Sequence, residues 1–192
     1  MTPTEQNQER PIINVVGEKV ALGPIHRGLL PLYWRWFNDF AYLRTTSKLG
    51  PMTMELLEKH YQHSSLAEDE VHFAIYERST MQPIGGGALT EIRDATATFL
   101  IGIGEKDCWG MGYGTEATRL TLAYGFAALG LRNVLLTVHS DNERGIRAYT
   151  RAGFRIMGRR RGVIERGGRL YDLIYMDCVA SEFEGPALDQ PL

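Results

Sequence analysis

Several features that define large protein classes are scarce or missing in this sequence of 192 residues. Its two cysteines, Cys108 and Cys178, are too few for a disulfide scaffold. No window approaches about 18 apolar residues, so no segment is a candidate for a membrane-spanning helix. The first ten residues, MTPTEQNQER, lack the apolar stretch of a signal peptide. These absences predict a soluble, cytoplasmic protein without a membrane partner.

A strong excess of charge of either sign is also missing. Lys and Arg number 21 and Asp and Glu number 23, which gives a net charge of −2. A general nucleic-acid binder usually has a basic excess, so we expect no nucleic-acid partner. The zinc patterns H-x-x-x-H and C-x-x-C do not occur, and His60 and His63 alone fit a solvated helix face. The sequence therefore predicts no metal site, and the lack of G-x-S-x-G gives no sign of a nucleophile elbow.

What remains has the composition of an ordinary globular domain, with 44% hydrophobic and 23% charged residues. We expect one domain over residues 12–180, with flexible tails at residues 1–11 and 181–192. Apolar periodicity and turn residues predict a mixed α+β fold around one sheet. The expected strands cover residues 12–25, 71–76, 83–91, 95–103, 133–138, 154–164 and 169–179. The expected helices cover residues 29–42, 53–63 and 115–131, followed by one that Ser140 and Glu143 cap and Gly153 ends.

The most informative segment is a glycine-rich loop, Trp109–Gly110–Met111–Gly112–Tyr113–Gly114–Thr115–Glu116–Ala117. It lies between an expected strand and the most strongly periodic helix. Glycines allow a tight turn and a close approach of a ligand to backbone amides. The first helical turn adds unpaired N–H groups and the positive end of the helix dipole. Together these features predict a site for a phosphate-bearing ligand.

Three phosphate-binding motifs can be compared with this loop. A P-loop needs Gly-Lys-Ser/Thr, which does not occur. A dinucleotide fingerprint needs G-x-G-x-x-G in the first βαβ unit, whereas the spacing here is G-x-G-x-G after several strands. The third pattern is R/Q-x-x-G-x-G/A, the pyrophosphate loop of acyl-coenzyme A-dependent acetyltransferases. Gly112 and Gly114 fit its two glycines, and Trp109 stands where Arg or Gln is usual. A glycine-rich turn without a ligand is the alternative.

The loop resembles the WGKGYGTEA-type loop of the GNAT acetyltransferase superfamily, in particular its RimJ/RimL-like branch, where a tryptophan at this position is common. A second stretch, SDNERGIRAYTRAGF, resembles the same family's later signature. Trp36, Asn38 and Asp39 resemble the early W-x-N-D element of that branch. The resemblance covers roughly residues 15 to 179. It implies a mostly antiparallel sheet in which two neighbouring parallel strands splay apart, with residues 99–103 and 133–138 on the two sides of the gap.

The resemblance also implies a binding site for acetyl-CoA as co-substrate. The backbone amides of five residues would wrap its pyrophosphate: Met111, Gly112, Tyr113, Gly114 and Thr115. An amide near Ile101 or Ile103 would polarise the thioester carbonyl, although the sequence does not identify which one. Asn142 matches the amide that binds the pantetheine arm, and its alternative role is a helix cap. Arg144 is a candidate phosphate contact, as is Arg147.

The same resemblance assigns a proton donor but leaves the general base open. Tyr149 matches the tyrosine that protonates the departing thiolate, with a core aromatic as its alternative role. Many relatives place a glutamate on the strand before Asn142, but here Thr137 stands near that position and cannot act as a base. Glu91 could act through a water chain, and His139 has a suitable pKa range. These two rank level, and Asp172 is a third candidate.

The sequence therefore predicts an acetyl-CoA-dependent N-acetyltransferase in which a neutral amine attacks the thioester directly in a ternary complex. Direct transfer needs no enzyme nucleophile, which disfavours a covalent route through Cys108. A small-molecule amine, such as an amino acid, polyamine or antibiotic, is the preferred acceptor, and a protein N-terminus is the alternative. A non-catalytic acyl-CoA-binding module is the alternative from another class, and a nucleotide-binding enzyme is a distant third. A homodimer is compatible with all of these, and the oligomeric state stays open.

Overall fold

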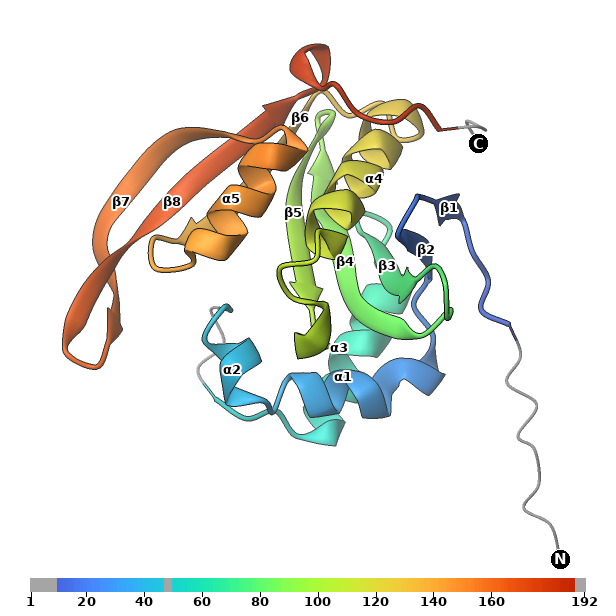
Figure 1. Cartoon of the computed structure of the whole chain (residues 1–192), viewed down its shortest axis with the longest axis horizontal. Helices are drawn as coiled ribbons and strands as arrows, with labels where there is room; N and C mark the ends of the chain where they lie inside the picture. The colour runs from blue at the N-terminus through green and yellow to red at the C-terminus, as the bar shows by residue number, and fades with distance from the viewer. Residues whose placement is uncertain (1–9, 47–49, 189–192) are drawn as a thin grey trace, which may run out of the picture.

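The computed structural model describes residues 10–46 and 50–188. Within them, eight strands form one sheet in the order β1-β2-β3-β4-β5-β6-β8-β7 (Figure 1). The strands are β1 (Val15–Val16), β2 (Val20–Pro24), β3 (Val71–Glu77), β4 (Pro83–Arg93), β5 (Thr96–Ile103), β6 (Asn133–His139), β7 (Arg155–Arg166) and β8 (Arg169–Val179). The helices are α1 (Leu30–Trp36), α2 (Phe40–Leu43), α3 (Met54–Leu66), α4 (Tyr113–Ala127) and α5 (Glu143–Ala152). The expected mixed α+β fold is confirmed.

The central pair of strands differs from all the others in direction. Strands β5 and β6 run parallel, whereas every other neighbouring pair in the sheet is antiparallel. Helices α4 and α5 pack on one face, where Leu122 and Phe154 join Phe99 and Leu136 in the main hydrophobic core. Figure 1 shows the long β7–β8 hairpin projecting from the sheet on the side of α5. The fold therefore has one helix-covered face and, at its centre, a parallel pair.

The opposite face is covered by the first helices only near one end of the sheet. Alternate residues of a strand face opposite sides, so Gly102 faces away from α4 while Phe99 faces toward it. A Cβ atom placed at Gly102 would overlap the hydroxyl of Tyr42 in α2. Further along β5, the side chain of Leu100 is 53% exposed. This face is therefore open beside the middle of β5.

Two local expectations are corrected by side-chain capping. The predicted helix over residues 29–42 is two helices, because Asp39 accepts hydrogen bonds from the amides of Ala41 and Tyr42 and begins α2 anew. The predicted cap at Ser140 is wrong: Asn142 caps α5 by accepting a hydrogen bond from the amide of Gly145 at 3.0 Å. Asn142 and Ser140 are equally good caps, so the sequence alone favoured the wrong one.

The segment after β8 also differs from its expectation. The sequence predicts a flexible tail over residues 181–192, but Phe183 packs on the main core with its ring centroid 5.1 Å from that of Phe126. Arg119 in α4 donates a hydrogen bond to the Glu184 carbonyl oxygen. The rest of the two predicted tails, residues 1–9 and 189–192, lies outside the described residues. The limits of the domain stay a prediction.

None of the helices within residues 10–46 and 50–188 is long and apolar enough to cross a membrane.

Candidate active site

The site begins where the parallel strands separate. The ladder between β5 and β6 ends at Thr98 and Leu135. Beyond it β6 stays paired with β8 as far as His139, and β5 stays paired with β4 as far as Ile103. The two strands therefore part into a gap that opens toward the glycine loop. This is the splayed pair that the resemblance implied.

The alternation of backbone amides along β5 shows which of them face the gap. The Gly104 amide donates to the Ile84 carbonyl oxygen of β4, so even-numbered residues of β5 direct their amides toward β4. The Ala95 carbonyl oxygen accepts from the Arg132 amide next to β6, as expected for an odd-numbered residue. The amides of Ile101 and Ile103 therefore face the gap, where an extended ligand could pair with them as another strand would.

The glycine loop forms a concave turn at the mouth of this gap. Gly110 and Gly112 have φ values of +80° and +90°, in the left-handed region that favours glycine. Gly112 begins α4 without any side-chain cap, which leaves the first amides of the helix for another partner. No heavy atom lies within 4 Å of a Cβ placed at Gly110. These features fit a phosphate group held by the backbone from Met111 to Thr115.

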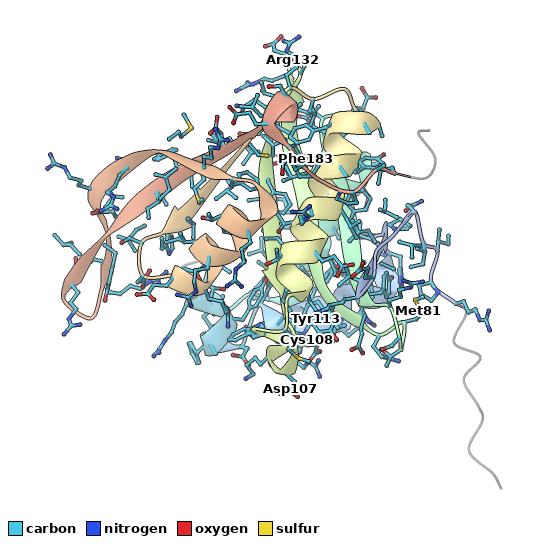
Figure 2. The ribbon with its side chains drawn as sticks, turned by 45° about the horizontal axis from the view of Figure 1, so that its top comes forward. Met81, Asp107, Cys108, Tyr113, Arg132 and Phe183 are labelled. Carbon is cyan, nitrogen blue, oxygen red and sulfur yellow. The ribbon has the colours of Figure 1, made fainter. Side chains whose placement is uncertain are left out.

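Side chains of the loop have different positions. Met111 is 54% exposed, whereas Tyr113 is buried and donates a hydrogen bond from its hydroxyl to Glu77 at 2.6 Å. This bond raises the pKa of Tyr113 to about 12. Tyr113 and Cys108 lie at the same end of α4, far from Phe183 at its other end (Figure 2). Because its side chain is buried, only the backbone of Tyr113 is available to a ligand. Burial also raises the pKa of the nearby Cys108 thiol, so this thiol is poorly suited to act as a nucleophile.

Sequence patterns missed a cation beside this loop. The ammonium group of Lys19 donates a hydrogen bond to the Met111 carbonyl oxygen at 3.1 Å. It also lies 3.6 Å from a Cβ placed at Gly112. Lys19 is in the turn between β1 and β2, 92 residues before Met111, so no local motif connects the two. It is a candidate phosphate contact.

A cation–π contact spans the mouth of the gap. The Arg144 guanidinium lies over the ring of Trp109, 3.8 Å from its centroid. The Trp109 indole also donates a hydrogen bond to the Ile103 carbonyl oxygen at 2.7 Å. Arg144 thus lies at the predicted site, whereas Arg147 pairs with Glu143 on the surface. The tryptophan at this position of the motif connects the end of β5 to the start of α5.

Asn142 and Tyr149 lie on the α5 side of the gap. The side-chain oxygen of Asn142 caps the helix, which leaves its NH₂ group as a donor toward a ligand. The Tyr149 ring is half-buried and packs edge-on against Phe99 and Phe154. Burial raises the pKa of Tyr149 to about 12, and Arg144 opposes this rise. The phenol is therefore protonated at neutral pH and can act as a proton donor.

The three candidate bases have different surroundings. Glu91 lies in a β-bulge of β4 with a φ of +53°, and its carboxylate accepts a hydrogen bond from the Thr98 hydroxyl at 2.8 Å. The paired part of β5 and β6 ends at Thr98, so Thr98 lies at the closed end of the gap, and its side chain is on the face opposite to α4. Asp172 accepts hydrogen bonds from the Gly162 amide and from Arg159 within the β7–β8 hairpin. Glu91 is thus beside the gap, and Asp172 is engaged in the hairpin.

His139 is 5% exposed at the end of β6, two residues after Thr137 and on the same face. Arg166 lies 2.6 Å from its Nδ1 atom. A guanidinium only donates, so Nδ1 must accept and the neutral ring carries its proton on Nε2. Burial first, and then Arg166, lower the pKa of His139, while Asp141 opposes this effect. The neutral ring therefore offers a donor rather than a free lone pair at Nε2, which disfavours it as a base.

A cavity of about 600 Å³ joins the predicted cofactor residues to the segment after α2 and to the β7–β8 hairpin. Trp109, Asn142 and Arg144 line one wall, and Arg44, Thr45 and Tyr171 line another. Arg166, near the hairpin tip, donates hydrogen bonds to Asp141 at 2.8 Å and to the Thr46 carbonyl oxygen at 3.4 Å. The hairpin thereby bounds the cavity on the side of α2.

Known proteins resemble this chain in fold and in sequence. A spermidine N-acetyltransferase from Vibrio cholerae, solved in complex with CoA and spermine, superposes with a TM-score of 0.79 at 23% identity, over 86% of this chain and 98% of that chain. The human alpha/beta-tubulin-N-acetyltransferase 9 is 28% identical over 156 residues, which are 73% of this chain and 74% of the relative. The probable N-acetyltransferase YjcK of Bacillus subtilis is 34% identical over 121 residues, 62% of this chain and 67% of the relative.

The family model for the acetyltransferase (GNAT) domain matches residues 20–155. This range includes the gap between β5 and β6, the glycine loop and all of α5. The match does not distinguish branches, so membership of the RimJ/RimL-like branch stays a prediction. It assigns an enzyme rather than a binding module. The chain belongs to the GNAT acetyltransferase family and is an N-acetyltransferase.

Proposed function

We propose that this enzyme transfers an acetyl group from acetyl-CoA to the primary amine of a small molecule, by direct attack in a ternary complex. The gap between β5 and β6 is the observation that carries the proposal. It lies between the helix-covered face and the open face beside Leu100. Acetyl-CoA would approach from the side of α4 and α5, and the amine from the opposite side. The thioester and the nitrogen would then meet in the gap.

The cofactor would be held mainly by backbone groups. The amides from Met111 to Thr115 would bind the pyrophosphate, with Lys19 and Arg144 adding positive charge. The amides of Ile101 and Ile103 would pair with the pantetheine arm, and one of them would hydrogen-bond the thioester carbonyl. The NH₂ group of Asn142 would donate to the same arm. This arrangement needs few charged side chains, consistent with the net charge of −2.

Two proton transfers complete the reaction. The attacking nitrogen must lose a proton, which would pass through water to Glu91 at the closed end of the gap. Tyr149 would donate its proton to the sulfur as the carbon–sulfur bond breaks. Its raised pKa keeps the proton available over the whole neutral range. Both groups flank the gap, Glu91 from the open face and Tyr149 from α5.

The cavity supports a small acceptor. Its volume of about 600 Å³ is bounded by the contact of Arg166 with the Thr46 carbonyl oxygen. Its lining contains three arginines, Arg44, Arg144 and Arg166, and two acids, Asp141 and Glu143. Arg144 is assigned to the cofactor and Arg166 pairs with Asp141 at 2.8 Å, which leaves Arg44 to favour an amine that also carries a carboxylate over a polyamine. The Vibrio cholerae enzyme, at 23% identity, shares the fold but does not fix the acceptor.

A protein N-terminus is the second candidate acceptor. The observation in its favour is the sequence similarity to a human enzyme named for acetylation of tubulin. The face beside Leu100 is open, so an extended peptide could reach the gap along it. A carboxylate-bearing small molecule and a peptide differ in size and in charge near the amine, which makes them separable by assay.

The decisive experiment measures thiol release from acetyl-CoA with a panel of matched acceptors. The panel contains free amino acids, their methyl esters, spermidine and short peptides with free N-termini. We expect turnover with free amino acids, and a marked loss with the esters because the carboxylate is masked. Turnover with peptides alone would overturn the small-molecule proposal. Preference for spermidine or for the esters would contradict the role assigned to Arg44.

A further inference from the structure

Two phenol hydroxyls lie side by side on the open face of the sheet, above a pair of glycines. Gly86 in β4 and Gly102 in β5 are cross-strand partners. A Cβ placed at Gly86 would lie 3.2 Å from the Tyr33 hydroxyl, and one placed at Gly102 would overlap the Tyr42 hydroxyl. Neighbouring strands are about 4.8 Å apart, so the two hydroxyls lie over adjacent strands. The missing side chains at these positions let the phenols reach the backbone.

Tyr42 is the phenol nearer to the gap, because β5 borders the gap and β4 does not. Its side chain is only 7% exposed, and its hydroxyl makes no hydrogen bond within the part of the chain that the structure describes. Asp39 fixes the start of α2, and Phe37 packs edge-on against the Tyr42 ring at 5.8 Å. The Tyr42 hydroxyl is therefore available as a donor to a ligand.

Tyr42 is also close to the proton donor of the proposed reaction. Burial, together with the nearby Tyr149 phenol, raises the pKa of Tyr42 to about 12. The two residues come from opposite faces of the sheet, Tyr42 from α2 and Tyr149 from α5. Both phenols therefore reach the same gap as neutral hydrogen-bond donors.

We propose that Tyr42 is a second catalytic phenol, whose hydroxyl donates a hydrogen bond to the thioester carbonyl oxygen from the acceptor side. This inference rests on acyl transfer taking place in the gap, as proposed above, and not on which amine is the acceptor. When the carbon–nitrogen bond forms, the carbonyl electron pair moves to oxygen, where the Tyr42 hydroxyl and a β5 amide stabilise it. When the carbon–sulfur bond breaks, sulfur takes the Tyr149 proton, nitrogen releases one through water to Glu91, and solvent reprotonates Tyr149.

The chain provides a matched control for this proposal. The Tyr33 hydroxyl likewise has no hydrogen-bond partner within the described residues, but it lies over β4, one strand farther from the gap. Tyr42→Phe and Tyr33→Phe each remove one hydroxyl and keep the ring. We expect Tyr42→Phe to lower kcat about 100-fold, as for loss of one oxyanion donor, and Tyr33→Phe to change it less than about two-fold. The dissociation constant of acetyl-CoA should stay within about two-fold in both.

A second variant displaces the hydroxyl without removing it. In Gly102→Ala the new methyl group would overlap the Tyr42 hydroxyl and lie 2.8 Å from the ring carbon that bears it, so the hydroxyl must move, and no positive φ at Gly102 adds strain. We expect kcat to fall by a similar factor, and the Tyr42→Phe/Gly102→Ala double variant to lose much less than the product of the two single losses. Circular dichroism and thermal unfolding would confirm that each variant is folded.

The outcomes distinguish the role proposed for Tyr42 from the proposal that the acceptor is a small molecule. The variants are compared with the best acceptor of the panel, whether small molecule or peptide, because the thioester carbonyl is common to both. A peptide preference together with a large loss in Tyr42→Phe would overturn the small-molecule acceptor alone. If Tyr42→Phe keeps kcat within about two-fold, or raises only the acceptor KM, Tyr42 does not touch the reacting carbonyl and the proposal is wrong.

Discussion

Among single residues, Tyr149 has the most direct assigned role, as proton donor to the departing thiolate. Its phenol is held by Phe99 and Phe154, and its pKa of about 12 keeps it protonated. We expect Tyr149→Phe to lower kcat about 100-fold while the acetyl-CoA dissociation constant changes little, because the ring and its packing remain. Steady-state kinetics and direct binding measurements test this. An unchanged kcat would remove Tyr149 from the mechanism.

The structure changes the ranking of the candidate general bases that the sequence gives. The sequence places Glu91 and His139 level, but Arg166 at Nδ1 leaves His139 with its proton on Nε2. We expect Glu91→Gln to lower kcat and to abolish the acidic limb of the pH–rate profile, since the carboxylate that accepts the proton is gone.

His139→Asn is the matched control for this prediction. The asparagine carbonyl can still accept from Arg166, and the variant removes the only titrating group at that position. We expect its acidic limb to match that of the wild type. A limb that persists in Glu91→Gln and disappears in His139→Asn would reverse the assignment.

At the scale of structural elements, the turn from β5 into α4 determines cofactor binding. Gly112 has a φ of +90° and begins the helix, so Gly112→Val brings about 1–3 kcal/mol of backbone strain and a side chain at the phosphate position. Gly130→Val brings comparable strain at a φ of +66°, with no heavy atom within 4 Å of the new Cβ. We expect both to lower thermal stability and only Gly112→Val to abolish acetyl-CoA binding in calorimetry. Equal affinities would contradict the loop assignment.

The start of α5 combines a structural and a ligand-binding role in one side chain. Asn142 caps the helix through its oxygen, which leaves its NH₂ group for the pantetheine arm. Asn142→Asp keeps the cap and removes the donor, so stability should change by less than about 0.5 kcal/mol. The acetyl-CoA dissociation constant should rise about tenfold, equivalent to one lost hydrogen bond.

Asn142→Ala separates the two roles further. It removes the cap as well as the donor, so it should also lose about 1 kcal/mol of unfolding free energy in urea titrations. Wild-type affinity in the aspartate variant would mean that Asn142 is a cap alone.

At the scale of the whole molecule, the sequence predicted the parts of the site that depend on backbone and local spacing. The glycine loop, the strand before it and the helix with Tyr149 follow one another within residues 96–152, and each has a local signal. Lys19 and Tyr42 carry none, because they reach the site from segments that are distant in sequence. Such contacts depend on packing across the sheet, which a single sequence does not encode as a pattern.

The same reason explains the errors at element ends. Asp39 divides the expected helix over residues 29–42, although apolar periodicity continues across it. Ser140 is not the cap because its hydroxyl accepts a hydrogen bond from the Asp172 amide of β8 at 3.0 Å, and Asn142 caps α5 in its place. Short side chains that can cap a helix recur within a few residues, and tertiary structure chooses among them.

The C-terminal segment gives the last prediction, because its two prolines and its lack of apolar periodicity predict a tail while its one large aromatic residue packs on the domain. Phe183 contacts Phe126 and lies over Gly153 at the end of α5. Its removal should leave a cavity beside α4 and α5, so we expect Phe183→Ala to lower the free energy of unfolding by about 2 kcal/mol. Leu170→Ala, at an exposed position of the hairpin, should change it by less than about 0.5 kcal/mol. If urea titrations find the two variants equally stable, residues 181–188 contribute no more than the flexible tail that their composition predicts.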